Sequence, residues 1–426
     1  MNLRHFSLSL AIFCCPAAFA AEAPSAILFV GDGMGQAAVT AARIYQGNAR
    51  DGKLALDTFD HVAIVRTFCS NTMVTDSAAS ATAFSTGHKT NALMIGQDPE
   101  GKTLETILEK AKKAGKSVGL VTTTTVTHAT PACFYAHIGS RALEAKIADQ
   151  LIDYGLVDVI MGGGREFFLP KGAVDPESGG NSNRMDGRDL VADAKAKGYR
   201  YIQNQAEFDE TLKIATDGGD PGKVLGLFQP GHMNYDIQRA NDTWGEPSLA
   251  EMTELAIKIL SRNPEGYFLM VEGGKIDHGS HANQAKLTIT DLLAFDKAIQ
   301  VGLDLTENAK DTLVVATADH ETGGLAINGY ANIEVSGDAL FTTEAPGGAK
   351  DIVTFGTGPG NNRDAMKDVP RDSADYKQPS VYPMGSAAHT GVDVHAWAAG
   401  PGADAFKGTI DNTEIALNMM KTLGLE

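Results

Sequence analysis

Acidic and histidine side chains of the kind that bind metal ions gather in one short segment, VEGGKIDHGSHAN at residues 271–283. If this segment is helical, Asp277 and His281 lie one turn apart on one face, where they could chelate a single cation. Glu272 ends the preceding apolar run, and its hard carboxylate oxygens suit magnesium better than zinc. The alternative is a surface helix that carries these residues without any function.

Further candidate ligands follow other apolar runs. Asp32 comes after AILFV with a glycine on each side, so its carboxylate could stand at a sheet edge with little crowding. Asp319 and His320 follow TLVVATA, and both could reach one ion only where the backbone turns away from the sheet. For each aspartate the alternative is a turn or a cap. In AAHTGVDVHAW, His389 is a more specific candidate than His395, which could equally be a strand or surface histidine. Together these side chains suffice for two zinc sites with nitrogen and oxygen ligands and one oxygen-rich site.

Ser77, in the segment MVTDSAASATAF, could be a helix cap or a nucleophile. The small residues that follow it predict a helix whose first N–H groups and positive dipole end would face an anion. A hydrolase of the Ser-His-Asp type would need a G-x-S-x-G elbow, which this segment lacks. A metal ion could activate the hydroxyl instead, as zinc lowers the pKa of bound water from about 15.7 to about 7. We therefore expect Ser77 to combine the two roles.

Two segments match phosphate-binding patterns, and both are rejected. GQDPEGKT at residues 96–103 fits G-x-x-x-x-G-K-T, but no buried strand leads into it. Asp98, Pro99 and Glu100 also stand where backbone amides should face phosphate, so a turn before a helix is predicted. GDGMGQ follows a strand, but it has Gln where a dinucleotide-binding loop needs its third glycine.

The elements that position these residues form an α/β pattern, in which apolar runs alternate with segments whose apolar residues are spaced by three and four. The runs are AILFVGDG, SVGLVTTT, VDVIMGGG, KVLGLF, GYFLMVEGG and DTLVVATADH, and the helical segments are TLETILEKAKKAG, RALEAKIADQLIDYG, SLAEMTELAIKILSR and NTEIALNMMKTLG. This alternation predicts a central, mainly parallel sheet with helices on both faces. Ligands of such folds bind beyond the carboxyl ends of the strands, where the candidate residues stand.

The chain divides into a signal peptide and one large domain. Residues 1–20, MNLRHFSLSLAIFCCPAAFA, have a basic start, an apolar stretch and a small-x-small end that is typical of a cleavage site. We therefore expect residues 21–426 to form a single exported domain that is periplasmic or secreted. From about 328 to 385 the periodicity fades into a Gly-, Pro- and Asp-rich segment, which predicts an inserted surface subdomain or long loop.

The mature chain is acidic and poor in cysteine. The full chain has 36 Lys and Arg against 53 Asp and Glu, and losing Arg4 with the signal peptide leaves 35 against 53, a net charge of −18. This charge argues against a nucleic-acid-binding module, and no internal apolar run is long enough to anchor the chain in a membrane. An anionic substrate must therefore be attracted locally. Cys69 and Cys133 remain, and a disulfide between them is permitted but not implied.

A series of motifs, in order, carries a resemblance to a known family. From VGDGMG through TDSAASATA, THATPACFYAHIGSR, VEGGKIDHGSH and TADHETGG to HTGVDVHAWAAGP, nearly the whole mature chain resembles the alkaline phosphatases, which are metal-dependent phosphomonoesterases. The resemblance implies hydrolysis of small phosphomonoesters through a phosphoserine at Ser77. It also implies that Arg141 clamps the phosphate, for which a planar guanidinium with two bonds to phosphate oxygens is suited.

The resemblance further implies two zinc ions and one magnesium ion. The implied ligands are Asp277, His281 and His389 for the first zinc, Asp32, Asp319 and His320 for the second, and Thr130 and Glu272 for magnesium, with Asp32 bridging toward it.

Two positions depart from the best-known bacterial pattern of the family. His128 stands where those enzymes have an Asp near magnesium, and His278 stands where they have a Lys near phosphate. The identity of the third metal and the release of phosphate therefore stay open, and a homodimer is expected from the family alone. A sulfatase would need a C-x-P-x-R motif, which neither Cys69 nor Cys133 begins. The remaining alternatives are a phosphodiesterase and an exported phosphate- or metal-binding protein.

Overall fold

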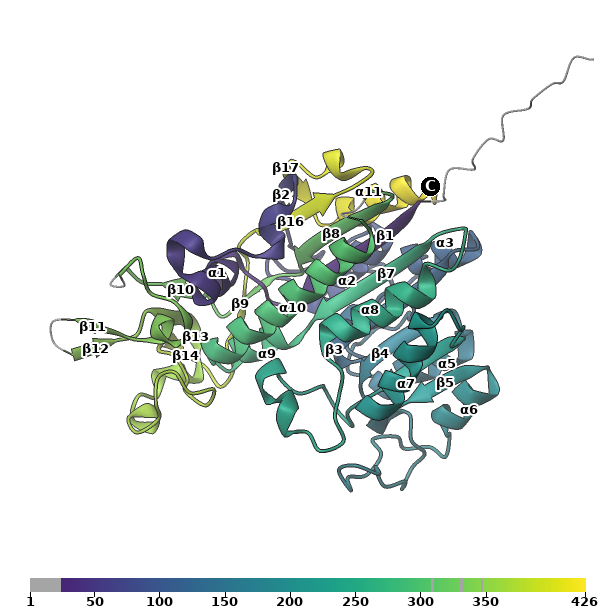
Figure 1. Ribbon diagram of the computed structural model, residues 1–426, viewed down its shortest axis with the longest axis horizontal. Helices are drawn as coiled ribbons and strands as arrows, with labels where there is room; N and C mark the ends of the chain where they lie inside the picture. Colours follow the sequence, from purple (N-terminus) through teal and green to yellow (C-terminus); the bar gives the residue numbers. More distant parts are fainter. Residues whose placement is uncertain (1–23, 308–309, 330–331, 346–347) are drawn as a thin grey trace, which may run out of the picture.

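The computed structural model describes residues 24–307, 310–329, 332–345 and 348–426, so the predicted signal peptide lies outside the described residues. At its centre is a ten-stranded sheet with the strand order β17-β2-β16-β8-β1-β7-β3-β4-β6-β5 (Figure 1). Nine of these strands run parallel to one another, and β16 runs antiparallel to its neighbours β8 and β2. The strands are β1 (Ser25–Gly31), β2 (His61–Arg66), β3 (Ser117–Thr125), β4 (Val159–Gly163), β5 (Tyr199–Ile202), β6 (Lys223–Leu227), β7 (Tyr267–Gly273), β8 (Thr312–Ala318), β16 (Val394–Ala399) and β17 (Gly408–Asp411).

Helices cover both faces of this sheet. On one face α8 and α10 contact each other, and on the other α2, α3 and α11 contact one another (Figure 1). The α-helices are α1 (Gln36–Asp51), α2 (Ser77–Thr86), α3 (Ile107–Lys113), α4 (Ala129–Ala132), α5 (Glu144–Tyr154), α6 (Leu190–Ala196), α7 (Gln205–Thr216), α8 (Leu249–Leu260), α9 (Lys275–His281), α10 (Ala285–Leu305) and α11 (Thr413–Leu423). The predicted fold class, a mainly parallel sheet between two helical layers, is confirmed.

The central strands β1, β7 and β8 are buried along their whole length, which explains why their sequences are continuous apolar runs rather than alternating ones. Aromatic pairs join the sheet to both helical layers. Phe29 of β1 packs edge to face against Phe295 of α10, with ring centroids 6.1 Å apart. Phe268 of β7 stacks on Phe134, which follows α4, at 5.8 Å. These contacts hold the sheet as a rigid support for the loops at its edge.

The strand register brings the carboxyl ends of β1, β7 and β8 together. Val30 of β1 pairs with Glu272 of β7 on one side and with Thr317 of β8 on the other. Asp32 and Asp319 directly follow β1 and β8, so both stand beside Glu272 at one edge of the sheet. This edge is the position at which open parallel sheets bind their ligands.

Between β8 and β16 the chain forms the predicted extra part, which lies at the left of Figure 1. It is more regular than expected, because it contains a three-stranded sheet, a two-stranded sheet and several 3₁₀ turns. Its small strands are β10 (Ala326–Ile327), β11 (Thr343–Ala345), β12 (Gly348–Lys350), β13 (Val353–Gly358) and β14 (Ser380–Pro383), and the pair β9 (Glu321–Thr322) and β15 (His389–Thr390) connects it to the main sheet. The Gly- and Pro-rich sequence explains why these strands are short.

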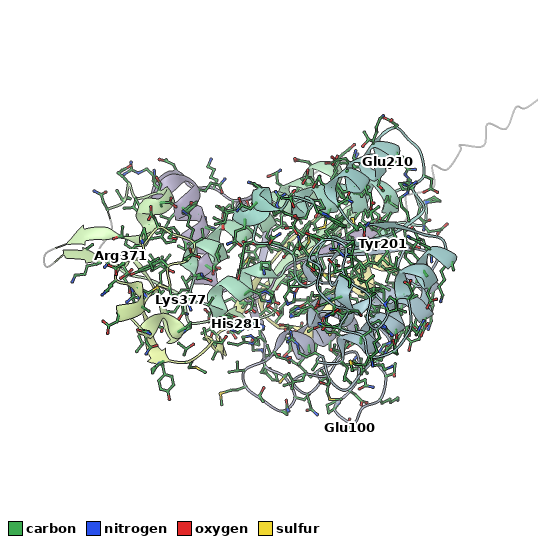
Figure 2. The ribbon with its side chains drawn as sticks, turned by 90° about the horizontal axis from the view of Figure 1, so that it is seen from below. Glu100, Tyr201, Glu210, His281, Arg371 and Lys377 are labelled. Atoms are coloured by element: carbon green, nitrogen blue, oxygen red, sulfur yellow. The ribbon has the colours of Figure 1, made fainter. Side chains whose placement is uncertain are left out.

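This insertion borders the candidate site. The backbone N–H of Ala285, the first residue of α10, donates to Gln378 Oε1 of the insertion at 2.7 Å. In the view of Figure 2, His281 lies between Lys377 of the insertion and Tyr201 of β5. The insertion therefore packs beside the segment that carries the candidate ligands of α9.

The rejected phosphate loop at residues 96–103 is a turn, as predicted. The Asp98 carboxylate accepts hydrogen bonds from the backbone N–H groups of Glu100 and Lys102, and α3 begins at Ile107. A carboxylate that occupies the loop's own amides excludes phosphate from them.

Two further sequence questions are answered by the described residues. Cys69 and Cys133 are both buried and both free, and burial raises the pKa of the Cys133 thiol to about 12. Among the described helices, none combines the length and the hydrophobicity that a membrane span requires.

Candidate active site

The carboxyl edge of the sheet concentrates negative charge in the protein interior. Asp32, Glu272, Asp319 and His320 have no solvent-exposed surface. Burial raises the pKa of Asp32 well above its usual range, and the charges of Asp319 and Asp277 raise it further. Burial also raises the pKa of Asp319 to about 7. Buried carboxylates in such number are costly unless a positive charge compensates them, so this edge has the electrostatics of a cation site.

Buried polar atoms without a hydrogen-bond partner cluster at the same edge. Of the ten such side-chain atoms among the described residues, six are Asp32 Oδ1, Asp32 Oδ2, Glu272 Oε1, Asp319 Oδ2, Thr130 Oγ1 and His128 Nδ1. Each unpartnered buried polar group costs about 1–3 kcal/mol. Since five of the six atoms are oxygens, the donor set fits cations that prefer oxygen ligands.

Candidate ligand atoms approach one another in three groups. Within each group, one nitrogen or carboxylate oxygen from every residue lies within 4.8 Å of the others, and the groups are Asp277 with His281 and His389, Asp32 with Asp277 and His320, and Asp32 with His128 and Glu272. The second group contains Asp277 where Asp319 was expected. Asp319 Oδ2 nevertheless lies 3.2 Å from His320 Nε2, so Asp319 borders this group.

The geometry of the first group requires a positive charge. Asp277 and His281 lie one turn apart on α9, as predicted, with His281 Nε2 3.1 Å from Asp277 Oδ2. His281 Nδ1 donates to the Ala387 carbonyl at 2.6 Å, and His389 Nδ1 donates to the Thr75 carbonyl at 3.0 Å. Because a neutral imidazole carries one proton, both Nε2 atoms present lone pairs, and they face each other at 3.2 Å. Two lone pairs repel at this distance unless a proton or a metal cation lies between them.

Ser77 is the first residue of α2, and its hydroxyl oxygen lies 3.3 Å from His320 Nε2. The expectation that Ser77 caps the helix is wrong. Asp76 is the N-cap, because its backbone is extended and its carboxylate accepts the N–H of Ala79 at 3.2 Å. The Ser77 hydroxyl is therefore not used for capping and faces the candidate ligands instead.

Arg141 lies beside this helix start. Its Nη1 donates to Asp76 Oδ2 at 3.0 Å, and its Nη2 donates to His128 Nε2 at 2.8 Å. A guanidinium has five N–H donors, so three remain for an anion. The side chain is 22% exposed, which keeps these donors accessible. Asp76 thus joins the start of α2 to the arginine predicted to bind phosphate.

His232 belongs to the same region, although no sequence signal selected it. It follows β6 in the segment PGHMNY, which matches no motif and has no ligand spacing. The backbone N–H of Thr125 donates to His232 Nδ1 at 3.0 Å. The His232 ring lies 4.6 Å from the His278 ring and 5.5 Å from the His128 ring, measured between centroids. Three imidazoles therefore gather next to Arg141.

Threonine hydroxyls orient the candidate ligands and were also not predicted. Thr122 and Thr124 of β3 both donate to Glu272 Oε2, and Thr322 of β9 donates to Asp277 Oδ1. In the sequence the Thr run at the end of β3 indicates only a β-strand, because threonine is common in strands.

The arrangement supports one kind of chemistry. A serine hydroxyl, a guanidinium and three groups of metal-ligand side chains meet at the carboxyl edge of one sheet. Guanidinium groups bind phosphate oxygens in pairs, and metal ions activate hydroxyl groups for phosphoryl transfer. The fold and the site thus define a metal-dependent phosphoester hydrolase.

Comparison with known sequences narrows this class. The sequence profile of the alkaline phosphatases matches residues 23–425. The chain therefore belongs to the alkaline phosphatase family and is a phosphomonoester hydrolase. The alkaline phosphatase of Gadus morhua is 37% identical over 442 residues, covering 92% of this chain and 90% of that protein. The tissue-nonspecific isozyme of Homo sapiens is 37% identical over 431 residues, covering 91% of this chain and 81% of that protein.

Solved structures agree with the sequence comparison. The alkaline phosphatase of the Antarctic bacterium TAB5 is 28% identical, with a TM-score of 0.73 over 95% of this chain and 99% of that one. The Thermus thermophilus enzyme is 29% identical, with a TM-score of 0.74 over 96% of this chain and 92% of that one. A variant of the TAB5 enzyme with Mg bound in its M3 site has a TM-score of 0.71 at 27% identity and covers 95% of this chain and 99% of that one. The predicted family resemblance is confirmed.

Proposed function

We propose that this protein is an exported phosphomonoesterase that transfers a phosphoryl group first to Ser77 and then to water, with two zinc ions and one magnesium ion as cofactors. The observation that carries this proposal is the place of the Ser77 hydroxyl. It stands at the start of α2, 3.3 Å from His320 Nε2, among buried side chains suited to cations.

The ligand assignment follows the chemistry of the donor atoms. The facing imidazole nitrogens of the first group suit zinc, and the unpartnered oxygens around Glu272 suit magnesium. Asp277, His281 and His389 would hold the first zinc, Asp32, Asp319 and His320 the second, and Asp32, Thr130 and Glu272 the magnesium, with His128 beside it. When bound, these ions would lower the pKa of the Ser77 hydroxyl and of the attacking water and offset the charge of the phosphoryl group.

The chain's own residues then bind and react. Arg141 donates its free N–H groups to two phosphoryl oxygens, and His278 lies on the same side of the phosphate. The Ser77 hydroxyl loses its proton as Oγ attacks phosphorus, the bond from phosphorus to the ester oxygen breaks, and the leaving alcohol takes up a proton. Water then loses a proton as it attacks the phosphoserine, the bond from phosphorus to Oγ breaks, Oγ regains a proton, and inorganic phosphate leaves. Two in-line displacements retain the configuration at phosphorus.

The same proposal covers the substrate and the location. Residues such as Arg141 bind the phosphate rather than the alcohol, so small phosphomonoesters of many alcohols should react. Residues 1–20 would direct residues 21–426, a single catalytic domain, to the periplasm or the exterior. A homodimer is proposed from the family alone.

The first experiment measures hydrolysis of an aryl phosphate monoester by the purified mature protein at mildly alkaline pH. Activity should disappear on chelation and return only when zinc and magnesium are both added. Faster hydrolysis of a bis-ester would instead support a phosphodiesterase. Equilibrium phosphate binding without any turnover would support a binding protein and contradict the proposal.

The nucleophile is tested by Ser77→Ala. We expect steady-state activity to fall by a factor on the order of 10³ or more and the burst of released alcohol to disappear, while zinc content stays normal. Ser70→Ala removes an exposed serine and serves as the matched control. A burst of normal size in the Ser77 variant would refute the phosphoserine assignment.

A further inference from the structure

His232 presents a fixed hydrogen-bond donor beside the candidate residues His128 and His278. Its Nδ1 accepts the backbone N–H of Thr125 at 3.0 Å, so the proton of the neutral ring is on Nε2. The two ring nitrogens lie on different sides of an imidazole, so Nε2–H points away from Thr125. The His232 side chain is exposed, whereas the neighbouring His128 and His278 are half-buried.

Arg141 supplies further donors next to the three imidazoles. One of its N–H groups donates to His128 Nε2 and another to Asp76 Oδ2. Arg141 keeps three free N–H groups. Among the described residues, no carboxylate hydrogen-bonds to His128, His232 or His278, so none of the three forms the His-carboxylate pair of a general base. The Nε2–H of His232 and the three free N–H groups of Arg141 match the oxygens of a phosphoryl group.

We propose that His232 binds a non-bridging phosphoryl oxygen through Nε2–H, in the bound ester and in the product phosphate. The inference rests on the proposed function, because it takes the anion beside Arg141 to be the substrate's phosphoryl group. His232 is then a phosphate-binding residue on the side of the site where the three imidazoles gather. Its ring is held in place by the Thr125 N–H and by the edge-to-face contact with His278 at 4.6 Å.

Substituting Asn or Gln for His232 tests the roles of its two ring nitrogens separately. Asn at position 232 can place its oxygen where Nδ1 accepts the Thr125 N–H, but it has no group at the position of Nε2. Gln can place an N–H near the position of Nε2. We expect His232→Asn to raise KM for an aryl phosphate and the inhibition constant of inorganic phosphate by the same factor, about 10- to 100-fold, the effect of one hydrogen bond to a charged group. His232→Gln should recover most of the loss.

The matched control is His88→Asn. His88 is exposed and uses Nδ1 to bond a backbone carbonyl, that of Thr86, but it follows the far end of α2. Its substitution should leave KM and phosphate inhibition unchanged. Each variant is loaded with zinc and magnesium, its metal content is measured, and phosphate binding is also measured by calorimetry, which requires no turnover.

Several outcomes would overturn the inference. Unchanged phosphate affinity in His232→Asn would do so, and so would a loss of metal content with KM unchanged, which indicates a purely structural role. An effect on an aryl phosphate but not on glycerol phosphate would mean contact with the alcohol instead of the phosphoryl group. Absence of turnover in the metal-loaded wild-type protein would refute the proposed function, whereas normal wild-type turnover with an unaffected variant refutes only the role of His232.

Discussion

At the scale of single residues, Asp76 couples the start of a helix to phosphate binding. Its Oδ1 accepts the N–H groups of Ala79 and Leu93, and its Oδ2 accepts from Arg141. Asp76→Asn keeps an oxygen for the two backbone donors but replaces the other with an NH₂ group, which cannot accept from a guanidinium. We expect the thermal midpoint to change little and KM for an aryl phosphate to rise roughly 3- to 10-fold, because a charge-assisted hydrogen bond is lost.

Asp76→Ala is the control for this prediction, since it loses both contacts. It should raise KM in the same way and also destabilise the protein by about 1 kcal/mol, the usual cost of removing an N-cap. Thermal unfolding separates the two effects. A wild-type KM in the Asn variant would show that Arg141 does not depend on Asp76 for its position.

The site residues that could be predicted from the sequence carry one of two signals. They follow an apolar strand, or they belong to one of the motifs that occur in order along the chain. Asp32 and Asp319 were found in this way. Asp76 stands inside a motif, but the sequence favours its neighbour Ser77 as the cap equally well, since both residue types cap helices. His232 was missed because only the folded chain brings the loop after β6 to the end of β3.

At the scale of elements, the turn after β1 is packed against α9. Gly33 has φ +67°, and a Cβ there would lie 2.7 Å from Asp277 Oδ1 and 2.8 Å from Thr322 Oγ1. Asp277 belongs to the first two ligand groups, and the Thr322 hydroxyl donates to its carboxylate. We expect Gly33→Ala to displace the Asp277 carboxylate and to weaken zinc retention at least about 10-fold, as changes around metal ligands commonly do. Zinc content after dialysis against a weak chelator measures this effect.

Gly101→Ala is the matched control for this element. Gly101 has φ +85°, but a Cβ there would meet no atom within 4 Å. The two variants therefore share a backbone cost of about 1 kcal/mol. Only in Gly33→Ala does the new methyl group also clash with Asp277 and Thr322. Equal zinc retention in the two variants would contradict the prediction.

Two physical reasons explain why several helices and strands are hard to predict from the sequence. α10 is buried on nearly all sides, because it packs between α1, α8 and the sheet. Its buried residues include Asp291 and Asp296, so the sequence shows no clear apolar stripe. β5 and β17 are short strands of four residues each. β2 alternates between buried and exposed residues near one side of the sheet, so it forms no apolar run. The long, fully buried strands were predictable because their apolar runs have one interpretation in an α/β pattern.

At the scale of the whole molecule, an acidic protein has to attract an anionic substrate. The full chain has a net charge of −17, so its long-range field repels phosphate esters. Part of this charge lies at the sheet edge, where the buried carboxylates of Asp32, Glu272 and Asp319 gather. Folding therefore brings acidic side chains together in the interior, and bound cations convert this edge into a site for an anion.

This conversion predicts how stability depends on metal and pH. Asp319 has its pKa raised to about 7 by burial, well above its usual 3.8, and the pKa of Asp32 is raised in the same direction. In metal-free protein the folded state holds protons that the unfolded state has released, so stability falls as pH rises from about 4 to about 7. Bound cations stabilise the ionised carboxylates and add RT ln(1 + [L]/Kd) to the free energy of unfolding, about 2.7 kcal/mol at a cation concentration of 100 times Kd.

Chelation should thus lower the thermal midpoint by several degrees, and by more at about pH 8.5 than at about pH 6. Asp319→Asn should flatten the pH dependence of the chelated protein, and an equal midpoint with and without metal at both pH values would contradict the cation site.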